Sequence, residues 1–181
     1  MSGVTGGLNE PRILLDETFT LGECPNWDAA NNRLYWTDIL DGALHALDVE
    51  TGARKTWKFE SELGCFGLTD QGRIIVALRK DIIFLDPQTD VRTPLARIED
   101  GIHSRTNDGK IGPDGAFWVG TMDDNADKQA IASLYRITAD GTVDEKITGF
   151  KISNGLAWSP DGAKMYHSDS RGPWVNRWDF D

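Results

Sequence analysis

The stretch NGLAWSPDGAKMYHSD, residues 154–169, contains two short apolar segments separated by a polar turn. Pro160 and Asp161 favour a tight turn, and Gly162 can adopt the positive φ that such turns often need. GLAW is therefore expected to be a buried strand, and the residues after Gly162 a second strand. Asn154 leads into this pair, and it should have a partner because an unpaired buried amide costs about 1–3 kcal/mol.

The same pattern occurs in three earlier segments, which read ECPNWDAANNRLYWTDI, GCFGLTDQGRIIVALR and NDGKIGPDGAFWVGTM. Their turns are anchored by Asn32, Gly72 and Gly115, so the unit recurs about every 40–50 residues. Each unit is expected to continue into a third strand and a fourth. The third strands are predicted at residues 43–49, 81–86, 133–138 and 175–180, and one of the fourth strands at residues 54–59.

Short strands in a repeat of this length are typical of a β-propeller, an all-β fold of four-stranded antiparallel blades. A generic antiparallel sandwich also has short strands and regular turns, but here the repeats share their turn residues in register. Residues 1–12 lack the basic start and apolar core of a secretory signal, which predicts a flexible N-terminal tail. Residues 13–181 are predicted to form one partial propeller of about four blades.

The bulk composition argues against several classes of function. A net charge of −10 argues against nucleic acid and anionic membranes as partners. No apolar run is long enough to cross a membrane. Cys24 and Cys65 fit no metal or redox spacing. Free thiols are typical of a reducing compartment, so a cytoplasmic location is expected.

The first strand of each propeller blade lines the central channel. Asn154, Asn107 and Gly64 stand at equal distances before their turn glycines, and Glu23 is one residue further from Asn32. The side chains of Glu23, Asn107 and Asn154 are therefore expected to converge. Three oxygen donors, one of them charged, suit a hard divalent cation. The alternative is that each asparagine caps a local turn.

Arg105 lies two residues before Asn107, so in an extended segment both side chains point the same way. A guanidinium is suited to binding substrate oxygens. The alternative is a surface arginine paired with Asp108 or Asp100. The sequence has no GxSxG, HExxH, P-loop or GxGxxG motif. The absence of a nucleophile motif favours metal-assisted chemistry over covalent catalysis.

Several ordered motifs resemble those of one known family. LGECPNW is similar to its LGExPxW motif, and RTNDGKIGPDGAFWVGTM to its RxNDGxxDPxGRxWxGTM segment. SNGLAWSPDG matches a further stretch, so the likeness extends from Leu21 to Asp181. The chain thus resembles the senescence marker protein/gluconolactonase/luciferin-regenerating enzyme family of regucalcin-like sugar lactonases. Cys24 is a departure, since the family usually has a small residue there.

The resemblance implies a six-bladed propeller with one divalent cation on its axis. It also implies a lactonase, a carboxylic ester hydrolase of carbohydrate metabolism that opens sugar-acid lactones to aldonic acids. By motif, Glu23 and Asn154 would bind the metal, while Arg105 and Asn107 would bind substrate hydroxyls. Calcium is the first expectation for such an oxygen-rich set, and magnesium, manganese, zinc and iron(II) are compatible with it.

Length separates this chain from the family pattern. Six blades need about 270 residues, and the family's further metal-ligating aspartate, its expected general base, would fall beyond Asp181. Whether these residues alone are active is left open, and open sheet edges would favour self-association. Two alternatives are a non-catalytic cation-binding scaffold and a related metal-dependent ester or phosphotriester hydrolase. Arg105 favours a polyhydroxylated substrate over the latter.

Overall fold

The structure is a computed structural model that describes Pro11 and residues 13–180. The predicted tail, residues 1–12, lies outside the described residues except for Pro11. The strands are β1 (Gly22–Asp28), β2 (Arg33–Asp38), β3 (Ala43–Asp48), β4 (Arg54–Lys58), β5 (Leu63–Leu68), β6 (Ile74–Leu78), β7 (Asp81–Leu85), β8 (Arg92–Arg97), β9 (Ser104–Ile111), β10 (Phe117–Asp123), β11 (Ala132–Ile137), β12 (Val143–Phe150), β13 (Ser153–Trp158), β14 (Lys164–Asp169) and β15 (Val175–Asp179).

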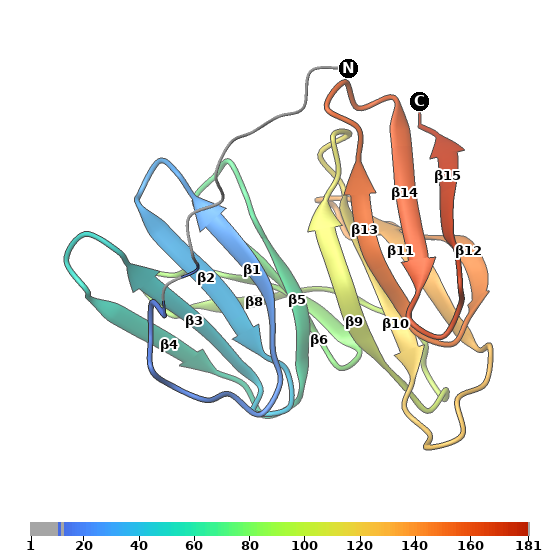
Figure 1. Cartoon of the computed structure of the whole chain (residues 1–181), viewed down its shortest axis with the longest axis horizontal. Coiled ribbons are helices and arrows are strands. Elements are labelled where there is room, and N and C mark those ends of the chain that lie inside the picture. The colour runs from blue at the N-terminus through green and yellow to red at the C-terminus, as the bar shows by residue number, and fades with distance from the viewer. Residues whose placement is uncertain (1–10, 12, 181) are drawn as a thin grey trace.

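The strands form four antiparallel sheets in chain order, which are the blades of a propeller. Blades 1, 2 and 3 contain β1–β4, β5–β8 and β9–β12, and blade 4 contains β13–β15. The first strands β1, β5, β9 and β13 lie side by side in the middle of Figure 1, and later strands lie further out. The prediction of an all-β propeller with about four blades is therefore confirmed. Among the described residues, none forms a helix that is long and apolar enough to cross a membrane.

The four turn anchors adopt the backbone conformation that the repeat predicts. Asn32 has a φ of 50°, and Gly72, Gly115 and Gly162 each have a φ of 74°. The Gly162 amide donates to the Ser159 carbonyl at 2.9 Å, which closes the turn between β13 and β14. Glycine and asparagine tolerate this left-handed region best, so the anchors keep all four hairpins alike.

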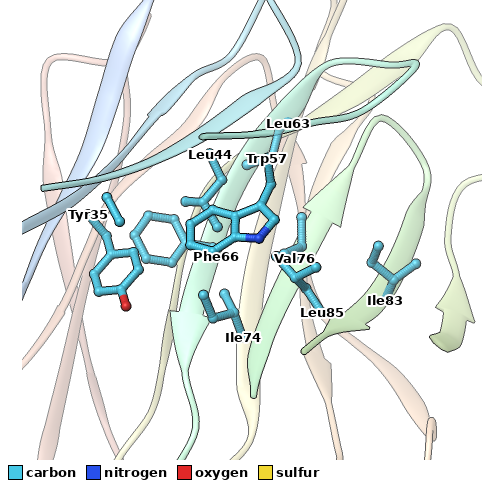
Figure 2. Packing of buried hydrophobic residues seen from close by; sticks show 10 residues of the cluster. Tyr35, Leu44, Trp57, Leu63, Phe66, Ile74, Val76, Ile83 and Leu85 are labelled. Atoms are coloured by element: carbon cyan, nitrogen blue, oxygen red, sulfur yellow. The ribbon is translucent and has the colours of Figure 1, made fainter. Parts of the chain in front are cut away.

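Hydrophobic clusters between neighbouring blades hold the propeller together. Figure 2 shows the cluster between blades 1 and 2, where Tyr35, Leu44 and Trp57 pack against Phe66 and Val76. Similar clusters join blades 2 and 3 and blades 3 and 4. Each fully buried side chain of this size contributes about 1.5–3 kcal/mol. The packing therefore fixes the first strands relative to one another, and with them the side chains along the channel.

Candidate active site

Each first strand has a β-bulge near its N-terminal end. The pairing of β1 with β2 shifts between Glu23 and Asn26, and that of β13 with β14 between Asn154 and Ala157. A shift also occurs in β5 between Leu63 and Cys65, and where β9 faces Val119 and Thr121 of β10. Bulges re-aim side chains and are frequent beside active sites. Here they turn side chains of β1, β9 and β13 towards one space, and β5 contributes only Gly64 to it.

The register of these bulges corrects one expectation. Glu23 pairs with Thr37 and Asn154 with Ser168, so both residues stand immediately before their bulges. In blade 3 that place belongs to Thr106, which pairs with Thr121, and Asn107 lies one residue further, inside the bulge. Asn107 and Asn154 stand at the same distance from their turn glycines, but they do not occupy equivalent positions in the strand pairing. The reason is that the hairpins of blades 3 and 4 differ by one residue.

A cleft of about 210 Å³ lies between the N-terminal ends of the first strands. All four residues singled out from the sequence line it, with Cys24, Gly64 and Asp108 beside them. The set is Glu23 of β1, Arg105 and Asn107 of β9, and Asn154 of β13. The four residues that the sequence places at one site thus line the same cleft, and their chemical roles remain predictions.

Asn154 has protein partners on both sides of its amide. Its Oδ1 accepts a hydrogen bond from the Gly155 amide at 2.9 Å, and its Nδ2 donates to Ser170 Oγ at 2.8 Å. The first contact is the kind of local bond that the turn-capping alternative describes. An amide oxygen has two lone pairs, so Oδ1 can accept a second contact from the cleft.

Glu23 and Cys24 enter the cleft from β1. The Glu23 carbonyl accepts a hydrogen bond from Thr37 Oγ1 at 3.2 Å, which fixes the backbone. Within the described part of the chain, no side chain hydrogen-bonds or ion-pairs with the Glu23 carboxylate, which is exposed to the cleft. Burial raises the pKa of the Cys24 thiol to about 11. Cys24 is therefore protonated at neutral pH and is not an activated nucleophile.

Asn107 and Asp108 join blade 3 to blade 4 across the cleft. Asn107 Nδ2 donates to the Ser153 carbonyl at 3.0 Å, and Asp108 Oδ2 accepts from the Leu156 amide at 3.0 Å. Asp108 was not predicted to line the site. Because one of its carboxylate oxygens accepts the Leu156 hydrogen bond, Asp108 holds β13 in place beside the cleft, two residues after Asn154.

Arg105 is buried, with a side chain only 7% exposed. Its Nη1 donates to the Thr106 carbonyl at 2.9 Å and to Asn107 Oδ1 at 3.3 Å. Burial lowers the pKa of the guanidinium, but arginine remains charged at neutral pH because its pKa is ordinarily above about 12. Arg105 and Asn107 do point the same way, as the alternation along the strand predicted.

The acidic neighbour of Arg105 is Asp124. Asp124 Oδ1 lies 3.8 Å from Arg105 Nε, whereas Asp108 binds the Leu156 amide and Asp100 pairs with Arg97 at 2.6 Å. The alternative pairing of Arg105 with Asp108 or Asp100 is therefore wrong. Asp124 belongs to an acidic loop after β10 that has no counterpart in the other repeats, so the repeat gave no register for it.

The donors at the cleft fit part of the coordination shell of a hard cation. Glu23 supplies a carboxylate and Asn154 an amide oxygen, both of which Ca²⁺ and Mg²⁺ prefer. The described residues contain no group of three His, Cys, Asp or Glu side chains placed to hold a metal ion. Calcium takes about 6–8 oxygen ligands, so water or other groups would complete the shell.

Asp169 does not belong to this donor set. Its carboxylate accepts hydrogen bonds from the Lys151 and Arg171 amides at 2.7 and 2.8 Å. It therefore fixes the backbone just before β13 and in the turn between β14 and β15, and it is not among the residues that line the cleft.

Comparison with known proteins agrees with these features. Residues 21–181 match the family described as the SMP-30/Gluconolactonase/LRE-like region. The chain is 43% identical over 171 residues to the 6-deoxy-6-sulfogluconolactonase of Pseudomonas putida, covering 94% of this chain and 58% of that protein. It is 33% identical over 161 residues to the L-arabinolactonase of Azospirillum brasilense, covering 87% of this chain and 54% of that protein.

The fold is also similar to those of solved structures. The calcium-binding protein regucalcin from Agrobacterium tumefaciens superimposes with a TM-score of 0.87 at 29% identity, covering 94% of this chain and 57% of that chain. The present chain thus spans somewhat more than half the length of these relatives. Because the family match extends over all four blades, the chain belongs to the SMP-30/gluconolactonase/luciferin-regenerating enzyme family.

Proposed function

We propose that the protein to which this chain belongs hydrolyses lactones of sugar acids with the help of one divalent cation. The observation that carries the proposal is the convergence of Glu23, Arg105, Asn107 and Asn154 on one cleft, from three separate blades. Relatives that share these blades are named 6-deoxy-6-sulfogluconolactonase and L-arabinolactonase. The substrate class is therefore a lactone of an aldonic acid, with hydroxyl groups on the ring.

In the reaction, water adds to the lactone carbonyl carbon, the bond to the ring oxygen breaks, and that oxygen takes up a proton. The product is the open-chain hydroxy acid. A bound divalent cation would polarise the carbonyl and stabilise the negative charge that develops on its oxygen. Glu23 and Asn154 are the residues that would hold it, and calcium is the cation that their oxygens fit best.

Arg105 and Asn107 would orient the substrate. The remaining N–H groups of the Arg105 guanidinium can donate to ring hydroxyls, which accept hydrogen bonds through their oxygens. Asn107 is held by Arg105 and by the Ser153 carbonyl, so its position is fixed before a substrate binds. Preorganised donors of this kind reduce the entropy cost of binding in a reactive orientation.

A second candidate is a propeller that binds the cation without turnover. It is favoured by the solved relative described as calcium-binding. A third candidate is a related ester or phosphotriester hydrolase. The buried Arg105 beside Asn107 fits a hydroxyl-rich substrate better than an apolar ester.

The test is lactone hydrolysis followed with a pH indicator, with calcium, manganese or zinc added and a chelator as control. Glucono- and arabinolactone are compared with an apolar aryl ester. Sugar-lactone turnover that is lost with chelator and in Asn154→Ala supports the proposal. Asn176→Ala, an exposed change on β15, is the control that should keep activity. Cation binding without turnover of either lactone supports the second candidate, and preference for the aryl ester supports the third.

A further inference from the structure

Four charged side chains form a chain of alternating sign that ends at the cleft. Glu62 Oε1 lies 2.8 Å from Arg79 Nη1, and Arg79 Nη2 lies 2.5 Å from Asp124 Oδ2. The other oxygen of Asp124 faces Arg105 Nε at 3.8 Å. One carboxylate thus bridges two guanidiniums, and only one of them, Arg105, lines the cleft.

The backbone places Arg79 and Asp124 on either side of Arg105. The Asp124 amide donates to the His103 carbonyl at 3.1 Å, and the Thr106 amide donates to the Arg79 carbonyl at 3.2 Å. Asp124 is thus bonded to the residue that precedes β9, and Arg79 to the β9 residue that follows Arg105. The positions of the charges around Arg105 are therefore set by backbone hydrogen bonds between two loops and the start of β9.

The exposure of the side chains indicates that the network orients the Arg105 guanidinium more than it stabilises the fold. The side chains of Glu62, Arg79 and Asp124 are 29%, 29% and 27% exposed, whereas that of Arg105 is 7% exposed. Partly exposed ion pairs contribute little to stability. A planar guanidinium, however, can donate to a ligand only in its own plane, so a charge that selects its orientation alters binding.

The distances also leave Arg105 able to donate to a ligand. Its Nη1 is used by Thr106 and Asn107. At 3.8 Å, Asp124 lies beyond hydrogen-bonding distance of Nε, because its other oxygen is drawn to Arg79. Within the described part of the chain, Nε and Nη2 make no hydrogen bond and are not among the fully buried polar atoms.

We propose that Asp124 is a positioning residue, which, restrained by Arg79, sets the plane of the Arg105 guanidinium while leaving its outer N–H groups available for substrate hydroxyls. The effect on substrate rests on the function proposed above, whereas the orientation of Arg105 does not. Without Arg79, the Asp124 carboxylate would be released to bond Arg105 directly and would compete with the substrate.

The orientation is tested by NMR of the arginine Nε–H groups in the 181-residue chain, with the Arg105 signal assigned by its loss in Arg105→Lys. Asp124→Asn should shift or broaden this signal while the backbone amide spectrum stays that of a folded protein. Arg79→Gln should shift it in a different way, towards a directly bonded Nε–H. Asp127→Asn, an exposed carboxylate of the same loop, is the matched control and should leave the signal unchanged.

The effect on substrate is tested by steady-state kinetics of the protein with a sugar lactone as substrate. Asp124→Asn should raise KM about tenfold with little change in kcat, because a ground-state contact to a charged donor is weakened. Asp124→Glu should restore part of the loss. An Arg105 signal and a KM that are both unchanged in Asp124→Asn would overturn the proposal. If no sugar lactone is hydrolysed by the unmodified protein, the proposed function fails and the Arg105 signal alone decides the positioning role.

Discussion

Glu23 and Asn154 occupy the same place in blades 1 and 4. The carbonyl of each accepts a hydroxyl hydrogen bond from the facing strand, from Thr37 at 3.2 Å and from Ser168 at 3.0 Å. Each is followed by a residue in the left-handed region, Cys24 with a φ of 53° and Gly155 with a φ of 68°. The same backbone conformation therefore brings the two oxygen donors to the cleft, although they are far apart in the sequence.

This conformation predicts an unusual response of Cys24 to substitution. A non-glycine residue at positive φ is strained by about 1 kcal/mol or more, and a β-branched residue by more than an unbranched one. Cys24→Gly should therefore be nearly neutral in urea unfolding, because relief of strain offsets the lost thiol contacts. Cys24→Val should lower the free energy of unfolding by about 1–3 kcal/mol. A glycine variant that is less stable than the valine variant would contradict the strain argument.

Gly64 explains why blade 2 contributes no side chain to the cleft. A Cβ added there would lie 2.5–2.6 Å from Thr106 Oγ1 and from the Thr106 backbone, because β5 and β9 approach closely. Gly64→Ala should therefore cost about 1–3 kcal/mol in the free energy of unfolding. The matched control is Gly22→Ala on β1, whose added Cβ would lie 3.4 Å from Phe19 and should be tolerated. Equal stability of the two variants would show that the strands can separate at Gly64.

His167 should make the stability of blade 4 depend on pH. It is fully buried, its Nε2 lies 2.8 Å from Ser153 Oγ, and burial lowers its pKa from 6.5 to about 4. The unfolded chain therefore binds a proton before the folded one as the pH falls. The stabilisation is complete above about pH 6.5, is lost between there and about pH 4, and amounts to about 3 kcal/mol.

Urea unfolding between pH 4 and 7 measures this contribution. His167→Gln, which cannot take up the proton, should flatten that part of the pH profile. His103→Gln, in an exposed loop, should keep the profile of the unmodified protein. A profile that is unchanged in His167→Gln would mean that another group causes the acid destabilisation.

The repeat made most of the fold predictable from the sequence. The tight turns require a positive φ, which Gly72 and Gly162 adopt without strain, so such residues mark every hairpin and fix its register within about one residue. That accuracy sufficed to bring Glu23, Arg105, Asn107 and Asn154 to one cleft. It did not suffice to show that Asn107 lies inside its bulge, because one extra residue in a hairpin shifts the pairing without changing the pattern of apolar residues.

The charged surroundings of Arg105 could not be predicted in the same way. Asp124 lies in a loop that the other blades lack, and its position depends on a backbone bond to His103. Arg79 comes from the neighbouring blade, and its contact with Asp124 depends on how the blades pack. A single sequence contains no pattern that predicts which side chains meet between blades, whereas turn residues do predict the contacts within a hairpin.

The proposed function rests on one cation site between the N-terminal ends of the first strands. The most direct measurement is a titration of the labelled protein with Mn²⁺, a paramagnetic cation that broadens the amide signals of nearby residues. Signals of Glu23, Asn107 and Asn154 should broaden first and together, chelator should restore them, and Glu23→Gln should require much more Mn²⁺. Broadening that begins instead in the acidic loop at residues 124–127, with the cleft signals unaffected, would contradict the proposal.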